Sequence, residues 1–423
     1  MLCMILVPSP QLLLNGNKVM RFLVVFIFLV TIKVADAHLI VSNNYMFKET
    51  SHLINDSFCR LNDSFQKIQF RGREFFVPRH KKSFKIAVLL PFHTDFSNTP
   101  VDKKRANVML EYYQGLKMAI NRIDSLDSKF IISLHDTDND TNQLKSILAS
   151  TNMKGVDLII GPTSKRQVEI AGKYCKKNKV ALFLPITNLI SSDYNPYVFN
   201  LNPSEAMKAQ EFLDYYKNHH QDKRLVIIRD KGYYDRTFGK ALVTACKQQQ
   251  IPILVVPYST KTEWSKTLHG KSVVIHTTQD KIKLNYSVTG LQAHRDSIIL
   301  VGSDKLLEFN DVDYNHWEKL NITFLSANKS QVANSNSIQM KTAYRLNYRD
   351  DPSWFSYMGY DHLLFACEIL DAFGTYFPIF IEGKEITYSN TNFSMKKTQS
   401  TFQNQYLGIF RLANGQLIIE NIK

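Results

Sequence analysis

The sequence predicts an α/β protein built from two doubly wound parallel-sheet lobes. From Phe84 onward, short apolar runs of strand length alternate with longer segments that have helical apolar spacing. The strand-like runs are apolar throughout rather than on every second residue, which is typical of parallel strands covered by helices on both faces. The alternation occurs twice in succession, and each set indicates a sheet of its own.

The first set starts at KIAVLLPF and extends to VALFLPIT. Its predicted strands are 85–92, 130–138, 156–162 and 180–187. Its predicted helices are 108–124, a helix that Asp140-Thr141 can cap, and 164–179.

The second set follows the same pattern. Its predicted helices are 205–220, 238–250 and 264–270, and its predicted strands are 224–230, 251–258, 272–278 and 297–304. A strand at 322–328 and a helix at 357–374 come next. The tail at 405–419 predicts a hairpin whose turn is Asn414-Gly415, a pair that readily adopts the left-handed conformations of a two-residue turn.

The N-terminal segment has the pattern of a secretory signal peptide. Met20-Arg21 precedes the apolar run FLVVFIFLVTI, and Ala35-Asp36-Ala37 supplies a small-residue cleavage site. The run is short for a membrane span, and a buried strand or short anchor helix is the alternative. We expect translation to start at Met20, residues 38–83 to form a linker or extension, and the mature protein to be periplasmic or secreted and not membrane-spanning.

The composition is that of a globular protein. Hydrophobic residues make up 44% of the 423 residues and charged residues 21%, with a formal net charge of +14. Because the lysines are spread along the chain without a compact basic block, we expect no nucleic-acid partner. The five cysteines form no CxxC pair, so buried thiols are expected rather than disulfides or zinc ligands.

The stretch VDLIIGPTSKRQ, residues 156–167, carries the most suggestive local chemistry. A strand ends in Gly161-Pro162, two hydroxyls follow at Thr163 and Ser164, and a helix begins. Free N–H groups and the dipole at a helix N-terminus favour negative charge. The stretch alone fits a phosphate loop, a ligand cleft or a capped helix.

Motifs of catalysis and metal binding do not occur in the sequence. It contains no GxxxxGK[ST], GxGxxG, HExxH or GxSxG. HDTDND, residues 135–140, lacks the glycine and glutamate that an EF-hand loop needs, because Thr141 and Ile147 occupy those positions. His219-His220 has no clustered partner ligands. We therefore expect neither an enzyme, nor a metal, nor a cofactor.

The order of segments resembles the type I periplasmic substrate-binding proteins, the leucine-binding-protein-like superfamily. Four places carry the resemblance, over residues 84 to about 378. They are KIAVLLPF, YYQGLKMAINRID, DLIIGPTSKRQVEIAGKYCKKNKVALFLPITN and FSYMGYDHLLFACEIL. Such a fold serves transport, sensing and scaffolding alike.

The resemblance implies two lobes joined by three crossings, with closure around a ligand by a hinge motion. We expect the crossings near Asn202-Pro203, near Ile322 to Ala327, and after Gly374. These assign residues 84–204 and 323–378 to the first lobe and 205–322 to the second. Residues 379–423 would form a C-terminal crossing and hairpin.

The resemblance also indicates ligand-contacting positions, each with a plainer alternative. Thr163 and Ser164 would hold a ligand carboxylate, or merely cap a helix; Thr187 and Asn188 would add a second loop, or form a polar turn. In the other lobe, GYYDRTFG would close over the ligand, and Asp304 is a candidate for binding an ammonium group. The predicted ligand-binding residues are Pro91, Phe92, Thr163, Ser164, Thr187, Asn188, Tyr233, Tyr234, Asp235 and Arg236. Arg236 departs from the family pattern and would favour an anionic ligand or point to solvent.

Two functions from different classes follow. The first is an exported, non-catalytic binding protein for a small polar ligand, amino-acid-like or other, which it would pass to an ABC-type membrane transporter or a receptor. The alternative is a cell-envelope scaffold or regulatory protein of the same fold that acts on peptidoglycan synthesis or the wall through protein contacts. The basic charge and the 38–83 extension fit an envelope partner.

Overall fold

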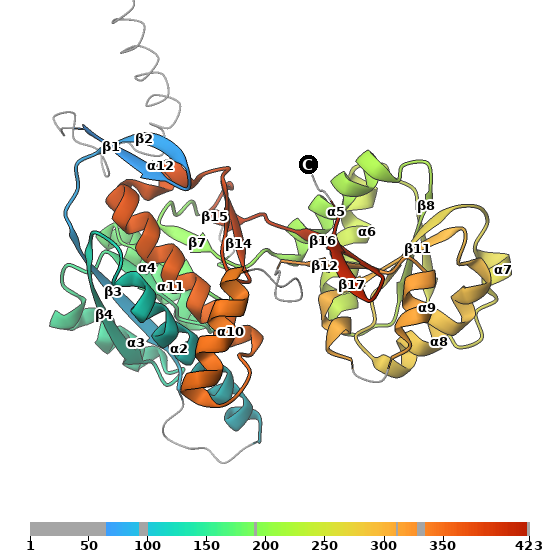
Figure 1. The fold of residues 1–423 in the computed structure, drawn as a ribbon, viewed down its shortest axis with the longest axis horizontal. Helices are drawn as coiled ribbons and strands as arrows, with labels where there is room; N and C mark the ends of the chain where they lie inside the picture. The colour runs from blue at the N-terminus through green and yellow to red at the C-terminus, as the bar shows by residue number, and fades with distance from the viewer. Residues whose placement is uncertain (1–64, 93–99, 190–192, 310–311, 328–334, 421–423) are drawn as a thin grey trace, which may run out of the picture. The chain divides into compact units, whose positions relative to one another are not determined.

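The computed structural model describes residues 65–92, 100–189, 193–309, 312–327 and 335–420. These residues form a two-stranded hairpin and two larger sheets, each covered by helices (Figure 1). The predicted signal peptide, the start at Met20 and most of the 38–83 extension lie outside the described residues.

The first sheet has the strand order β13-β14-β15-β7-β6-β5-β3-β4. Strands β4, β3, β5, β6, β7 and β15 are parallel, and β13 and β14 continue the sheet antiparallel. The strands are β3 (Ser83–Leu90), β4 (Lys129–Asp136), β5 (Leu158–Ile160), β6 (Ala181–Leu184), β7 (Val198–Asn200), β13 (Glu385–Thr387), β14 (Asn392–Lys397) and β15 (Phe402–Asn404).

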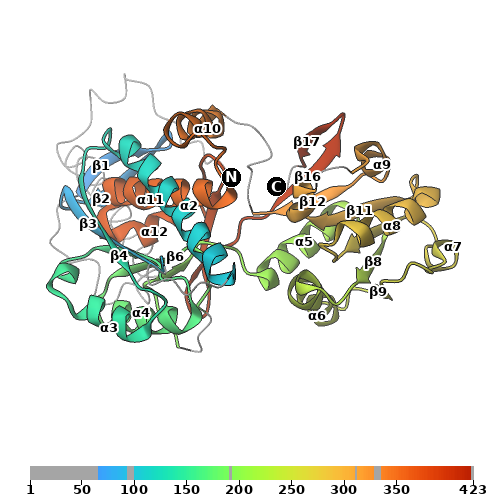
Figure 2. The same ribbon diagram turned by 90° about the horizontal axis from the view of Figure 1, so that it is seen from below.

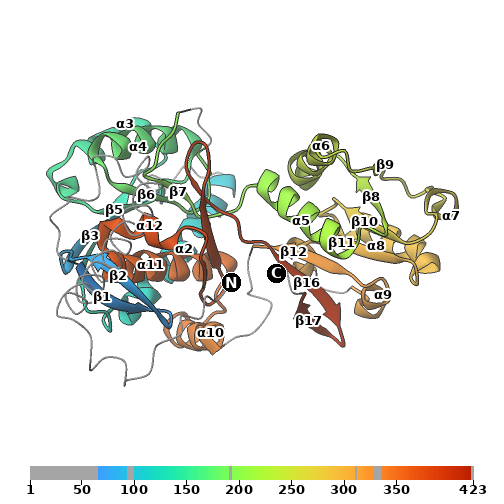
Figure 3. The ribbon, with the colours of Figure 1, turned by 90° about the horizontal axis from the view of Figure 1, so that it is seen from above.

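Helices cover both faces of this sheet, as the apolar strands predict. Figures 2 and 3 show α3 and α4 on one face and α2, α11 and α12 on the other. Asp140 caps α3 through its side chain, as expected. The helices of this lobe are α2 (Pro100–Ile123), α3 (Thr141–Ala149), η2 (Thr151–Met153), α4 (Lys165–Asn178), α10 (Ser335–Tyr348), α11 (Trp354–Phe373), η6 (Gly374–Tyr376) and α12 (Phe377–Ile381).

The helices α2 and α11 approach each other so closely that only glycine fits at the crossing. A Cβ atom on Gly115 would lie 1.9 Å from the carbonyl oxygen of Ser356, and one on Gly359 would lie 2.0 Å from that of Tyr112. The Tyr112 hydroxyl also lies 3.0 Å from Nδ1 of His362. The motifs YYQGLK and YMGYDH therefore form one packed interface in the core of the first lobe.

The second sheet has the order β17-β16-β12-β11-β10-β8-β9. Strands β9, β8, β10, β11 and β12 are parallel, and β16 and β17 form an antiparallel edge. The strands are β8 (Arg224–Arg229), β9 (Ile253–Pro257), β10 (Ser272–His276), β11 (Ile298–Ser303), β12 (Thr323–Ser326), β16 (Gly408–Ala413) and β17 (Gln416–Ile419).

Alternate residues of these strands enter two separate cores. Leu225 and Ile227 of β8 pack with α5 and α6, whereas Val226 and Ile228 pack on the opposite face against α7, α8 and α9. The helices are α5 (Glu205–His219), η3 (Asp235–Gly239), α6 (Lys240–Gln248), α7 (Trp264–Thr267), α8 (Lys281–Leu291), η4 (Gln292–His294), η5 (Asp304–Glu308) and α9 (Tyr314–Lys319). The observed double coverage explains why the strands carry no polar alternation.

The division of the C-terminal half differs from the expected one. We expected residues from 323 onward to join the first lobe, but β12 pairs with β11 and β16 and so belongs to the second sheet. Residues 385–404 stay in the first sheet, and the third crossing falls at 405–407, after Gly374 as expected but with three further strands of the first sheet before it. The apolar run at 322–327 pairs in parallel with β11. Its apolar pattern identifies it as a strand, but the pattern does not show which sheet the strand joins.

The hairpin at the C-terminal end confirms its predicted turn. Ala413 pairs with Gln416, so Asn414 and Gly415 form a two-residue turn, with φ of 52° and 70°. Both angles are in the left-handed region that this turn requires.

The predicted linker at 38–83 contains an unexpected hairpin, β1 (Phe65–Phe70) and β2 (Arg73–Pro78). Phe70 and Phe75 pack edge-on against Phe373 at distances of 4.9 and 5.3 Å between ring centroids. Arg71 contacts Glu368 at 2.6 Å. The hairpin is therefore part of the first lobe rather than a linker.

Residues Trp354–Ile381 are long and apolar enough to cross a membrane by composition alone. In the fold they include α11, whose side chains form the centre of the first lobe's core. The apolar side chains of α11 are thus buried in the core of the protein's own first lobe.

Candidate functional site

The carboxyl ends of parallel strands meet at one edge of each sheet, where open α/β folds place their ligands. At this edge of the first sheet, β5 ends at Ile160 and the chain turns through Gly161. Gly161 has φ +90°, and a Cβ atom there would lie 2.1 Å from the carbonyl oxygen of Leu89. Only glycine can therefore bring the following residues to the edge, and the Gly161-Pro162 bond is cis.

Ser164 is the residue at the N-cap of α4. Its carbonyl oxygen accepts a hydrogen bond from the N–H of Val168 at 2.9 Å, but its side chain makes no capping hydrogen bond. The plainer alternative, in which the hydroxyl caps the helix, is therefore not what the structure contains. The half-buried hydroxyl and the N–H groups of the first turn lie together at the positive end of a 14-residue helix.

The loop after β6 lies against the loop after β5. The Thr187 hydroxyl donates a hydrogen bond to the carbonyl oxygen of Thr163. The next residue, Asn188, has a side-chain oxygen that is buried and has no hydrogen-bond partner in the described part of the chain. The structure thus brings the predicted residues of these two loops together.

Pro91 and Phe92 follow β3 at the same edge. Pro91 is buried, and the N–H of Phe92 donates to Oδ1 of Asp136, at the end of β4, over 3.0 Å. The half-buried Phe92 ring packs edge-on against Tyr113 at 5.8 Å. These two residues form a fixed wall beside the Thr163 loop, with Asp136 holding the backbone.

The loop GYYDRTFG of the second lobe divides into exposed and buried residues. Tyr233 is 71% exposed. Arg236 is also exposed, and its guanidinium donates to the carbonyl oxygen of Lys231 at 2.7 Å. These two side chains remain accessible to a ligand.

Tyr234 and Asp235 instead serve the second lobe's own structure. Tyr234 stacks on Phe238 at 4.8 Å within the core, and burial raises the pKa of its phenol. Asp235 is 3% exposed, and its two carboxylate oxygens accept from Arg229 at 2.6 and 3.0 Å. Thr277 donates to the same carboxylate at 3.0 Å. Tyr234 and Asp235, both predicted to contact a ligand, thus have buried side chains whose contacts lie within the second lobe.

Other polar residues that the sequence reasoning passed over lie at the carboxyl edge of the second sheet. Asp230 follows β8, and one of its carboxylate oxygens lies 3.5 Å from Nζ of Lys283, whose ammonium lies 5.7 Å from the centre of the Tyr258 ring. The sequence offered a signal for this group, because Asp230 and Tyr258 are the last residues of two predicted strands and so belong to the carboxyl edge of the sheet.

A second polar group lies after β11 and β12. The Ser326 hydroxyl donates to Asp304, and the amide of Gln279 donates to the hydroxyl of Ser303 at 3.4 Å. Asp304, the candidate for binding an ammonium group, thus lies at the carboxyl edge of the second sheet and accepts from a hydroxyl.

Within the described residues, no group of three or more His, Cys, Asp or Glu side chains could hold a metal ion. The three described cysteines are buried free thiols, at Cys175, Cys246 and Cys367. Burial raises the pKa of each thiol, to about 11 for Cys246, so these thiols stay protonated and unreactive near neutral pH. His220 contacts the Tyr215 hydroxyl at 3.2 Å rather than other ligands.

Comparison with known proteins supplies the family context. The sequence model of the family described as "periplasmic binding protein" matches residues 85–269. The two-lobed arrangement of parallel sheets is that of solved structures from the same group. The chain has a type I periplasmic-binding-protein fold.

Three of the structures similar to this fold are described as branched-chain amino acid ABC transporter proteins, one of them as a periplasmic ligand-binding protein. A putative branched-chain amino acid ABC transporter protein from Rhodospirillum rubrum has 12% identity and a TM-score of 0.59, and the match covers 80% of this chain and all of the other. An ABC-type branched-chain amino acid transporter protein from Rhodopseudomonas palustris has 14% identity and a TM-score of 0.53, over 80% and 96% of the two chains. A branched-chain amino acid ABC transporter periplasmic ligand-binding protein from Burkholderia xenovorans has 11% identity and a TM-score of 0.52, over 80% and 94%. No curated protein matches the sequence.

Proposed function

We propose that this protein is an exported, non-catalytic binding protein that holds a small polar ligand and delivers it to an ABC-type membrane transporter. The family match and the descriptions of similar structures support a binding role. The periplasm is the compartment that this role requires, which agrees with the signal-peptide pattern.

The observation that carries the proposal is the paired loop edge at Thr163, Ser164 and Thr187. The Thr163 carbonyl oxygen already accepts a hydrogen bond from Thr187, which joins the two loops. The Ser164 hydroxyl caps none of the first N–H groups of α4, so these groups have no side-chain cap from the N-cap residue. Such an end favours a carboxylate, because N–H donors and the helix dipole both stabilise negative charge.

An amino-acid-like ligand would therefore present its carboxylate to Ser164. Lys165 and Arg166 begin α4 directly after Ser164 and are exposed, so two cations lie on the same turn as the hydrogen-bond donors and the helix dipole that would hold the carboxylate. Its other end would contact the second lobe's polar edge, where Asp304 has the charge that an ammonium group needs.

Calorimetry on the purified full-length chain tests the proposal. The titrants are leucine, isoleucine, valine and a panel of other amino acids, short peptides and sugars. For a ligand with a carboxylate, Ser164→Ala should weaken binding about tenfold, since it removes one hydrogen bond to a charged group. Thr163→Val removes the neighbouring hydroxyl and keeps the size of the side chain.

Thr244→Val is the matched control. Its hydroxyl lies on the exposed face of α6 and bonds only within the helix, to the carbonyl oxygen of Lys240 at 2.9 Å. It should leave binding unchanged. Absence of any ligand across the panel, or equal losses in Thr244→Val and Ser164→Ala, would count against the proposal.

One observation favours the second candidate function, a cell-envelope regulator that acts through protein contacts. In the second lobe, the Asp235 carboxylate accepts hydrogen bonds from Arg229 and Thr277. One of the predicted ligand contacts is therefore already bonded within the protein. Recovery of a peptidoglycan synthase or wall fragments from envelope extract, without small-molecule binding, would favour this function over transport.

A further inference from the structure

A pocket of about 390 Å³ lies in the first lobe beside the Thr163 and Thr187 loops. It is formed where the loop after β6 meets the end of β7, the turn between β14 and β15, and the residue before α5. Its volume is within the range of pockets that hold small molecules in proteins. The lining residues are Asn188, Leu189, Asn200, Ser204, Thr398, Gln399, Ser400, Thr401 and Gln403.

The side chains that line this pocket are almost all polar and uncharged. Eight of the nine residues carry an amide or a hydroxyl, Leu189 is the one apolar residue, and none carries a charge. The N-terminus of α5 beside the pocket is already capped by the Ser204 side chain, so neither an anion nor an ammonium group would find an opposite charge here. An apolar ligand would gain little, since it would cover polar groups and leave them unpaired.

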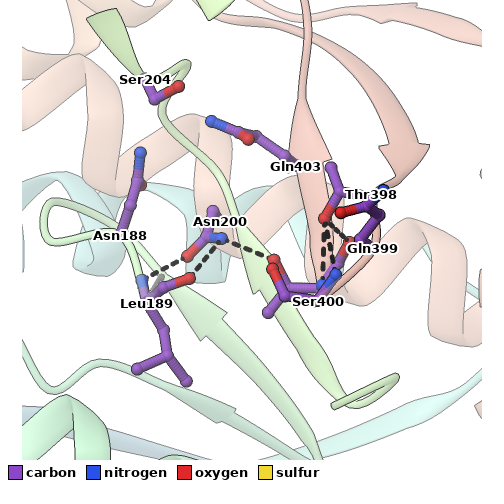
Figure 4. A pocket seen from close by; sticks show the side chains of 9 residues that line it. Asn188, Leu189, Asn200, Ser204, Thr398, Gln399, Ser400 and Gln403 are labelled. Carbon is purple, nitrogen blue, oxygen red and sulfur yellow. Dashed lines mark hydrogen bonds between the residues drawn. The ribbon is translucent and has the colours of Figure 1, made fainter. Parts of the chain in front are cut away.

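The frame of the pocket is held in place by its own hydrogen bonds. The Asn200 side chain accepts from the N–H of Leu189 at 2.8 Å and donates to its carbonyl oxygen at 3.3 Å. It also donates to the Thr401 hydroxyl at 3.0 Å, as the dashed lines of Figure 4 show. The N–H of Thr401 donates to the Thr398 hydroxyl at 3.0 Å. Asn200 therefore ties the loop after β6 to the β14–β15 turn.

One of the lining residues has a buried group that lacks a partner among the described residues. The side-chain oxygen of Asn188 is buried and accepts no hydrogen bond from the described residues. Figure 4 shows the Gln403 side chain extending toward Ser204 and Asn188. A buried acceptor without a donor is costly, so the Asn188 amide would gain a hydrogen bond by turning toward a ligand hydroxyl or amide in the pocket.

We propose that this pocket binds a neutral, hydroxyl-rich molecule of monosaccharide size through the amides of Asn188, Gln399 and Gln403. An amide presents a donor and an acceptor side by side, and a hydroxyl can serve both at once. The site differs from the Ser164 edge, which favours negative charge, so it goes beyond the proposed function and can be tested separately.

The test uses the full-length chain and titrates it with D-glucose, D-galactose, N-acetyl-D-glucosamine and myo-inositol. D-glucuronate and D-glucosamine serve as charged counterparts of similar size. Saturable binding of at least one neutral compound, with no binding of the charged ones, is the expected result. If none of the four neutral compounds binds, or the charged compounds bind equally well, the proposal is wrong.

Substitutions then place the binding in the pocket. Gln403→Leu and Gln399→Leu should each weaken binding of the neutral compound about tenfold, because each removes hydrogen bonds to the ligand. Gln416→Leu, on the exposed edge strand β17, is the matched control and should have no effect. Unchanged binding in both pocket variants would overturn the assignment.

Asn188→Leu gives a readout that does not depend on choosing the right sugar. It removes a buried acceptor that has no partner in the unliganded protein, so the melting temperature should stay level or rise while sugar binding is lost. A marked fall in melting temperature would show that Asn188 serves the fold rather than a ligand. Ser164→Ala should leave sugar binding intact, which separates this site from the proposed amino-acid site.

Discussion

Gly115 of α2 and Gly359 of α11 lie at one helix crossing, where each backbone occupies the space that the other's Cβ atom would need. This contact fixes α11, the main core helix of the first lobe, against α2. The first prediction concerns this contact.

Gly359→Ala should destabilise the protein by about 2 kcal/mol or more, although alanine favours helix more than glycine does. The reason is that the new methyl group would meet the backbone of Tyr112, which cannot move aside as a side chain could. Urea unfolding measures the change.

Gly172→Ala is the matched control, because Gly172 is also a helical glycine. Its Cβ atom would meet only the tip of the flexible Leu189 side chain, at 2.9 Å. We expect a change near zero. Equal destabilisation in the two variants would show that backbone contact is not the cause.

The carboxylate of Asp361 fixes the tip of the β13–β14 hairpin to α11. It is fully buried and accepts from the N–H groups of residues 389–391 and from the Ser389 hydroxyl, at distances from 2.6 to 3.1 Å. Burial raises its pKa to about 6 despite these donors. Asp361→Asn should cost about 2 kcal/mol, since one acceptor oxygen is replaced by an amide that itself donates.

Ser389→Ala removes a single donor from the same carboxylate and should cost about 1 kcal/mol. Amide hydrogen exchange of residues 389–391 provides the local measurement. Protection that is unchanged in Asp361→Asn would contradict the anchoring role.

Stability should depend on pH through the buried His276. Its Nδ1 accepts the N–H of Thr278 at 3.1 Å, so Nε2 carries the proton and donates to Ser287 at 2.8 Å. Burial lowers its pKa from 6.5 to about 4. Between these values His276 binds more protons in the unfolded chain than in the native one, so its contribution to stability decreases as pH falls below 6.5, opposite to the contribution of Asp361, whose pKa is raised.

At pH 5 this loss should reach about 2 kcal/mol relative to neutral pH. His276→Asn keeps an acceptor near Thr278 and cannot be protonated, so its stability should change less between pH 7 and pH 5. Chemical unfolding at the two pH values checks this, and an equal loss in parent and variant would contradict it.

The predicted residues of the GYYDRTFG loop should differ sharply in their contribution to stability. Asp235→Asn leaves Arg229 without its carboxylate and should cost about 2 kcal/mol, because the Asp235 side of the pair is buried. Arg236→Ala should change stability by less than about 0.5 kcal/mol, since its side chain is exposed. Thermal unfolding distinguishes them, and similar values for both would refute the structural role of Asp235.

The sequence predicted the elements of this fold better than their partners. KIAVLLPF and VALFLPIT read as buried strands because helices cover both faces, and Asn414-Gly415 read as a turn because few residue pairs tolerate its angles. The sheet membership of β12 depends on its pairing with β11 and β16, which local patterning does not encode. The β1–β2 hairpin was not predicted because its strands are short and polar residues alternate with apolar ones, and because the partner of Phe70 and Phe75 is Phe373 of α11, about 300 residues further along the chain.

The candidate site shows the same division. Thr163 and Thr187 could be placed together because parallel strands end at one edge, and the structure joins them by a hydrogen bond. Burial of Tyr234 and the Arg229–Asp235 pair could not be anticipated, because a polar residue in a loop can satisfy itself within the fold as well as contact a ligand. The pocket at Gln399 and Gln403 joins segments about 200 residues apart, and only the folded chain brings them together.

The last strands of the chain have a consequence for synthesis in the cell. The first sheet receives β13, β14 and β15, and the second receives β16 and β17, from the final 40 or so residues. A ribosome that has made only the first 380 residues has therefore produced neither sheet in full. Both lobes must complete their folding after translation of the C-terminal segment, so a nonsense mutation in this segment would damage the whole protein rather than remove a dispensable tail.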